Sequence, residues 1–180
     1  MQTTNKFVRL LNRNLIYRHK GDGLKICGLF LSMLLGLGQA AEPVKVIDGD
    51  SLFVGKTEIR LEGIDAPEYH QMCYDSENKA YPCGKEAYLA LKKLVGTRPV
   101  RCEKVIIDKY RRQVSVCWLG EVNLNRWMVE NGWAVAYTRY TRDYAAAERR
   151  AKKHRRGIWQ GRFMKPEYYR ILQKEAKNLH

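Results

Sequence analysis

Short strand-like runs broken by turn residues, from Val44 to Leu61, restrict most strongly how this chain can fold. The runs 44–47, 51–54 and 57–61 are rich in Val, Ile, Leu and Phe. Two turns separate them, the first built on Asp and Gly and the second on Gly and Lys. Short apolar runs interrupted in this way predict a β-meander.

A second pair of strand-like runs, 100–107 and 113–119, surrounds the connection 108–112. Cys102 and Cys117 are equidistant from a point in that connection, between Lys109 and Tyr110. In a hairpin centred there, the two residues face each other across the strands, which favours a 102–117 disulfide.

The other two cysteines in this part of the chain, Cys73 and Cys83, lie in a polar segment and would close a small loop there. Four cysteines allow three pairings, and we favour 73–83 together with 102–117. A zinc site is the rival interpretation, but the chain lacks the close CxxC pairs that zinc ligands usually form.

Helical periodicity occupies three segments, near 84–95, 122–131 and 141–156. The order of strands and helices fits an α+β fold, mainly β, in which a five-stranded barrel carries about three flanking helices. The aromatic residues of the C-terminal tail are expected to pack back on this domain. We therefore expect a domain at 41–162 and a basic helical tail at 163–180.

The N-terminus predicts a signal peptide at 1–40. Six basic residues precede an apolar run at 26–38, and small residues around Ala40 follow it. The apolar run is shorter than the roughly 20 residues that cross a bilayer. We expect an exported protein, periplasmic or secreted, with no stable membrane insertion after cleavage. The alternative is a membrane anchor formed by an uncleaved signal.

Positive charge is concentrated at the C-terminal end. The chain has a formal net charge of +14, and residues 145–180 hold 11 basic and 3 acidic residues. Such an excess attracts polyanions, nucleic acid above all. A solvated basic helical surface is the alternative interpretation.

Charged residues among apolar neighbours mark a candidate site. Asp50 and Asp65 could hold a hard cation, and Glu68 could reach a water beside it. Arg60, inside a strand-like run, and Arg112, at the hairpin end, could bind a phosphate. Together these groups suit phosphodiester hydrolysis, because its transition state gathers negative charge on the phosphoryl oxygens.

Three blocks of sequence, in order and at matching spacing, resemble the staphylococcal nuclease (thermonuclease) family. The blocks are Val46-Ile47-Asp48-Gly49-Asp50-Ser51, Arg60-Leu61 with Gly63-Ile64-Asp65-Ala66-Pro67-Glu68, and Asp108-Lys109-Tyr110-Arg111-Arg112. The four cysteines resemble an exported bacterial branch of that family. The resemblance implies a five-stranded OB-fold.

The resemblance also implies roles for individual residues. Calcium would be held by the carboxylates of Asp50 and Asp65 and by the backbone carbonyl of Ala66. Arg60 and Arg112 would clamp phosphate, and Glu68 would be the general base. The remaining matches are nucleotide-binding residues: Lys109, Tyr110 and Tyr137.

The function implied is calcium-dependent cleavage of single-stranded DNA or RNA to 3′-phosphorylated products by a monomeric endonuclease. The alternative is a non-catalytic nucleic-acid-binding OB-fold module in the cell envelope. A copy without activity would be expected to lack some of the five acid and arginine residues, and all five are present.

Two positions depart from the family pattern. Arg111 stands where the family usually has glycine, so a turn that needs positive φ would be strained there. Arg139 replaces the second aromatic residue of the nucleotide pocket, with Tyr140 adjacent to it.

Overall fold

The structure, a computed structural model, describes residues 42–179. Its largest sheet contains five main strands in the order β1-β2-β3-β8-β7, and β9 pairs with β8. The bounds are β1 Val44–Val46, β2 Ser51–Val54, β3 Thr57–Leu61, β7 Arg101–Ile107, β8 Gln113–Leu119 and β9 Val122–Asn123. The strands β1, β2 and β3 form the meander that the sequence predicts, with antiparallel pairing throughout.

The strands β3 and β8 pair in parallel, with Arg60 beside Val114. This pairing joins the meander to the second hairpin. The sheet curls into a partial barrel, and the OB-fold architecture expected from the sequence is confirmed. Two smaller ribbons accompany it. They are β4 (Ile64–Asp65) with β10 (Val135–Ala136), and β5 (Cys73–Tyr74) with β6 (Ala80–Tyr81).

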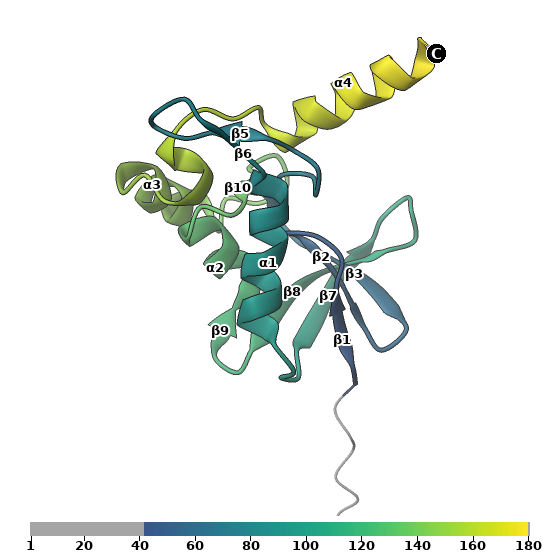
Figure 1. Cartoon of the computed structure of the whole chain (residues 1–180). Helices are drawn as coiled ribbons and strands as arrows, with labels where there is room; N and C mark the ends of the chain where they lie inside the picture. Colours follow the sequence, from purple (N-terminus) through teal and green to yellow (C-terminus); the bar gives the residue numbers. More distant parts are fainter. Residues whose placement is uncertain (1–41, 180) are drawn as a thin grey trace, which may run out of the picture. The chain divides into compact units, whose positions relative to one another are not determined.

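The helices are α1 Cys83–Val95, α2 Leu124–Glu130, α3 Ala145–Lys153 and α4 Pro166–Asn178, with a 3₁₀ turn at Gly157–Gln160. The helix α1 packs across the sheet, and α2 packs against β8 (Figure 1). In α1, Ala87, Leu91 and Val95 recur every four residues, so they lie on one face, and all three are buried against strand residues such as Leu52 and Leu61.

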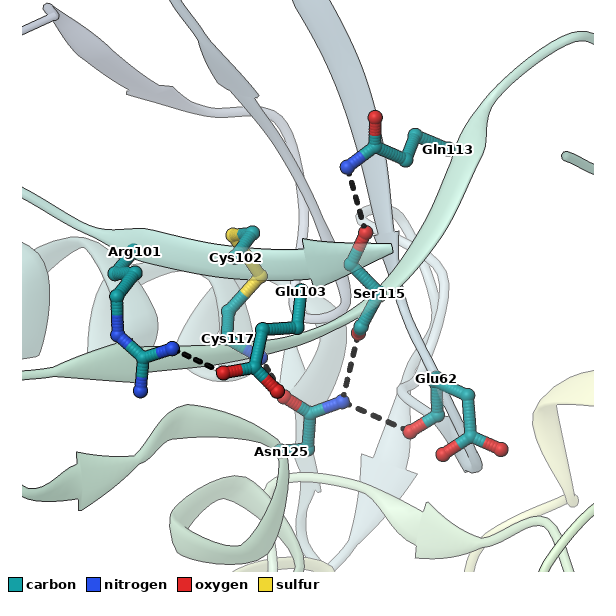
Figure 2. The surroundings of a disulfide bond; sticks show 8 residues. All are labelled: Glu62, Arg101, Cys102, Glu103, Gln113, Ser115, Cys117 and Asn125. Atoms are coloured by element: carbon teal, nitrogen blue, oxygen red, sulfur yellow. Dashed lines mark hydrogen bonds and ion pairs between the residues drawn. A yellow bond between two sulfur atoms is a disulfide. The ribbon is translucent and has the colours of Figure 1, made fainter. Parts of the chain in front are cut away.

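A buried asparagine fastens α2 to the sheet (Figure 2). The side-chain amide of Asn125 donates to the carbonyls of Glu62 and Ser115, and its oxygen accepts from the N–H of Cys117 at 3.0 Å. Asn125 is fully buried, so these bonds offset the cost of removing its amide from water. The same strand position carries the disulfide Cys102–Cys117, whose two residues are direct partners across β7 and β8.

The second disulfide, Cys73–Cys83, links β5 to the start of α1. Both cysteines are buried in a small second core with Val135 and Ile158, against which Trp159 and Phe163 pack. The structure thus contains both cysteine pairs that the sequence favoured. Further along the tail, Tyr168 remains more than half exposed, unlike the inward packing expected for the tail aromatics.

Within residues 42–179, no helix is long and apolar enough to cross a membrane. The signal peptide predicted at 1–40 lies outside the described residues.

Candidate functional site

Three neighbouring segments bring the central charged residues together. Asp50 closes the turn that precedes β2, Arg60 lies in β3, and Asp65 ends β4. The register pairs Ser51 with Arg60, which places Asp50 beside the arginine. Gly49 permits this arrangement, because a Cβ at that position would stand 2.6 Å from the Cβ of Ala66.

The guanidinium group of Arg60 joins two buried carboxylates. One terminal nitrogen donates to Asp50 Oδ1 at 2.6 Å, and the other donates to Asp65 Oδ1 at 2.8 Å. Asp50 Oδ2 also accepts from the backbone N–H of Ala66 at 2.8 Å. Asp50 is 3% exposed and Asp65 is 1% exposed, so the ion pairs form away from bulk water. Charges buried to this degree require such partners.

A third carboxylate, Asp48, raises the density of negative charge. Burial and the nearby Asp50 raise the pKa of Asp48 to about 7. Burial likewise raises the pKa of Asp65, although hydrogen bonds from Arg170 oppose this. The neighbouring Asp50 carboxylate raises the pKa of Arg60, against the effect of burial. When all of its acids are ionised, the cluster therefore carries more negative charges than its two arginines neutralise.

Arg170, a residue that the sequence did not single out, is the second of these arginines. From α4 it reaches both oxygens of Asp65, at 2.9 and 3.0 Å, and it also donates to Glu68 Oε1 at 2.8 Å. Burial disfavours its charge, but the hydrogen bonds to Asp65 and Glu68 outweigh burial and raise its pKa. No local signal distinguishes it among the basic residues of the tail.

An open cleft of about 1020 Å³ lies over the cluster. All six residues predicted to be catalytic or nucleotide-binding line it: Arg60, Glu68, Lys109, Tyr110, Arg112 and Tyr137. The buried acids Asp50 and Asp65 lie behind this lining. The predicted residues are thus brought to one part of the molecule from segments that are far apart in the sequence.

Arg112 lines the cleft but does not touch the acid cluster. Its Nε donates to Asp108 Oδ2 at 2.9 Å, and its Nη2 lies 2.8 Å from the same oxygen. The guanidinium group also lies 5.3 Å from the ring centre of Tyr110. Asp108 holds Arg112 at the end of the hairpin, facing the cleft and separate from Arg60.

The predicted nucleotide-binding residues form the aromatic part of the cleft. Tyr110, at the hairpin tip, is 67% exposed, and Lys109 lies beside its ring. Tyr137 meets Tyr140 edge to face, with ring centres 4.9 Å apart. Tyr140 also lines the cleft, so it supplies an aromatic ring near the position where Arg139 interrupts the family pattern.

The turn before Arg112 has the left-handed conformation that usually requires glycine. Arg111 has a φ of 67°. A residue with a side chain pays roughly 1–2 kcal/mol for that conformation. The departure from the family pattern therefore strains this turn.

We expect Arg111→Gly to raise the free energy of unfolding by up to about 1 kcal/mol. Relief of the strained φ outweighs the extra freedom that glycine gives the unfolded chain, which costs about 0.4–1 kcal/mol. Urea denaturation measures the change. Lys109→Gly is the matched control in the same turn, where φ is negative, and it should destabilise the protein. Equal effects of the two substitutions would contradict the strain at Arg111.

The acid cluster suits a hard divalent cation in donor type and charge. Its side-chain donors are carboxylate oxygens, which calcium prefers. Within residues 42–179, however, no group of three or more His, Cys, Asp or Glu side chains is arranged to hold a metal ion. A cation here would need the two aspartates together with backbone and water oxygens. It would also compete with the arginines bound to them.

The fold and the cleft define an OB-fold protein with a buried acid–arginine cluster beneath a cleft lined by charged residues of both signs and by tyrosines. A family model described as staphylococcal nuclease homologue matches residues 58–161. The chain belongs to this family. The matched range contains Arg60, Asp65, Glu68 and Arg112, whereas Asp50 precedes it.

Several known proteins are similar to the chain. The succinoglycan biosynthesis protein ExoI of Rhizobium meliloti is 39% identical over 127 residues, which cover 67% of this chain and 66% of that protein. The thermonuclease of Staphylococcus hyicus is 30% identical over 132 residues, covering 67% and 76%. A probable staphylococcal-like nuclease of rice, CAN2, is 30% identical over 149 residues, covering 81% and 38%. The chain thus spans about two thirds of ExoI and less than half of the plant protein.

Proposed function

We propose that this protein is a calcium-dependent nuclease that hydrolyses phosphodiester bonds in single-stranded DNA or RNA. One observation carries the proposal: Arg60 joins two buried aspartates beneath a cleft that Glu68 and Arg112 also line. Two relatives that are named as nucleases support the same class of reaction.

In this proposal each charged residue has one task. Asp50, Asp65 and the carbonyl of Ala66 hold calcium, which when bound supplies positive charge to the phosphate and to a nearby water. Glu68 accepts the proton of the attacking water. Arg60 and Arg112 bind the phosphoryl oxygens and stabilise their charge in the transition state. The departing oxygen belongs to the 5′ side, so the phosphate remains on the 3′ end of the product.

The cleft lining supports binding of a nucleic-acid chain. Lys109, Tyr110 and Tyr137 line the cleft, and in this proposal the first two contact a terminal phosphate and the third stacks its ring on a base. Positive charge on α3 and on the tail attracts the polyanion over longer distances.

Export is also part of the proposal. Residues 1–40 would be a cleaved signal peptide, 41–162 the nuclease domain and 163–180 its helical tail. Two disulfides support an oxidising destination, the periplasm or the medium. An uncleaved signal would instead leave the protein anchored to the membrane. We propose a monomer.

Calcium should switch the activity on. Purified protein is expected to cleave a fluorescent single-stranded DNA when calcium is added, and a chelator should stop the cleavage. Asp65→Asn should abolish it, whereas Asp143→Asn, at an exposed loop position, should not. If folded protein shifts the same DNA in a gel but does not cleave it, the proposed nuclease activity is rejected and the non-catalytic binding module is favoured.

A further inference from the structure

The start of α4 is fixed to the domain, whereas the rest of the helix is exposed. Pro166 is buried, and the side-chain amide of Gln71 donates to the carbonyl of Met164 at 2.7 Å. Residues 171–179 are exposed, and Figure 1 shows the helix extending away from the sheet. The contacts of α4 with the cleft are therefore made by its first turns.

Two side chains of these turns, Glu167 and Arg170, contact the residues assigned to substrate and cation. They are three residues apart, so they lie on the same face of the helix. Glu167 accepts from the hydroxyl of Tyr137 at 3.1 Å and lies 3.4 Å from Arg139. Burial and this hydrogen bond raise the pKa of Tyr137.

Arg170 makes the stronger contact. Its guanidinium group binds Asp65 through two nitrogens and Glu68 through one, so it spans a proposed cation ligand and the proposed base. Paired hydrogen bonds of this kind between ionised groups are among the strongest that side chains form. Both oxygens of Asp65 are then engaged by arginine.

A divalent cation and this guanidinium group need the same oxygens. Arg60 takes one oxygen of Asp65 as well, so a cation can reach that carboxylate only if an arginine releases it. Arg60 is held from both sides by Asp50 and Asp65 and is 19% exposed, whereas the side chain of Arg170 is 37% exposed. Arg170 is therefore the arginine that is easier to displace.

We propose that Arg170 sets the cation affinity of the site by acting as a tethered competitor for Asp65. The inference rests on the proposed function, because it takes Asp65 as a cation ligand. Binding of the cation and release of Arg170 are then linked, and each opposes the other by the same factor. The first turns of α4 control access of calcium to the acid cluster.

Calcium titration of the full chain by isothermal calorimetry tests this competition without measuring catalysis. Arg170→Ala should lower the Kd for calcium by about tenfold or more, since it removes charge-assisted bonds that the cation must otherwise break. Arg170→Lys keeps the charge but loses the paired N–H donors of the guanidinium group, so its Kd for calcium should fall between those of Arg170→Ala and the unchanged protein. Lys174→Ala is the matched control, because it removes the same charge one turn further along the helix.

Hydrogen exchange of residues 166–178 gives a second measurement. Saturating calcium should speed exchange in this segment of the unchanged protein, because the helix loses its contact with Asp65. Unchanged or weaker calcium affinity in Arg170→Ala would overturn the competition. Equal tightening by Lys174→Ala would also overturn it, since general charge would then be the cause.

The two proposals fail in different ways. If calcium binds and Asp65→Asn removes the binding, but Arg170→Ala leaves the Kd unchanged, the competition is wrong and the cation site stands. If calcium binds neither the unchanged protein nor Arg170→Ala, the calcium site and the competition are both rejected. If Arg170→Ala weakens binding of a nucleotide 3′,5′-bisphosphate and not of calcium, Arg170 is a phosphate ligand and the competition is again rejected.

Discussion

Replacement of Glu68 by glutamine is expected to lower kcat for single-stranded DNA cleavage by about 10²–10⁴-fold, the usual contribution of a general base. The amide keeps the size of the side chain but cannot accept the proton of the attacking water. The carboxylate lies at the cleft surface with 37% of its side chain exposed, so the core is untouched. The free energy of unfolding should change by only about 0.5 kcal/mol.

Glu58→Gln is the matched control for this experiment. Glu58 lines the same cleft from β3, so its substitution removes an equal charge without touching the acid cluster. Its kcat should remain within a few-fold of the unchanged protein. Comparable losses in both variants would show that the overall charge of the cleft, and not proton transfer by Glu68, governs the rate.

Replacement of Arg60 by methionine should cost about 3–5 kcal/mol of folding free energy, because it leaves two buried carboxylates without their shared partner. Methionine keeps most of the side-chain volume, so the loss of folding free energy measures the removal of the charge. Urea is the suitable denaturant because it does not screen charges. Arg101→Ala, which removes an exposed ion pair with Glu103, should cost less than about 1 kcal/mol.

The loss caused by Arg60→Met should depend on pH. Arg60 lowers the pKa of both Asp48 and Asp65, so its removal raises both values further. A carboxyl group with a raised pKa in the folded state binds more protons there than in the unfolded chain, and stability then falls as pH rises. The deficit should be larger at pH 8 than at pH 5, and Asp50→Asn should restore part of it. A pH-independent deficit would indicate lost packing instead.

Much of the barrel could be predicted because its strands are short and its turns carry Gly and Asp. The Cys102–Cys117 pair followed from simple counting along the hairpin. Near the tip Ile107 lies opposite Gln113, a pairing centred on Tyr110, and the bulge between Lys104 and Ile106 then shifts the register by one residue, so that Cys102 lies opposite Cys117. Counting could not reveal the bulge itself, because it arises from the pairing of two strands and not from one residue.

The site was predictable only in part. Local sequence placed Asp50, Arg60 and Asp65 near one another, because two tight turns leave little freedom between them. The contact between Arg170 and Asp65 spans 105 positions and joins a helix to a strand end. Any of several basic residues in the tail could have made that contact, so the packing of α4 had to be known first. Binding of Arg112 by Asp108 was likewise invisible, although the two residues are four positions apart.

The order in which the chain is synthesised gives the Arg170 contact another meaning. A ribosome delivers Asp50, Arg60 and Asp65 within 16 residues, but Arg170 emerges 105 residues after Asp65. Until then the acids repel one another with a single arginine between them. The barrel can therefore gain this counter-ion only after α4 has been synthesised, so this helix completes a site that the strands β2 to β4 begin.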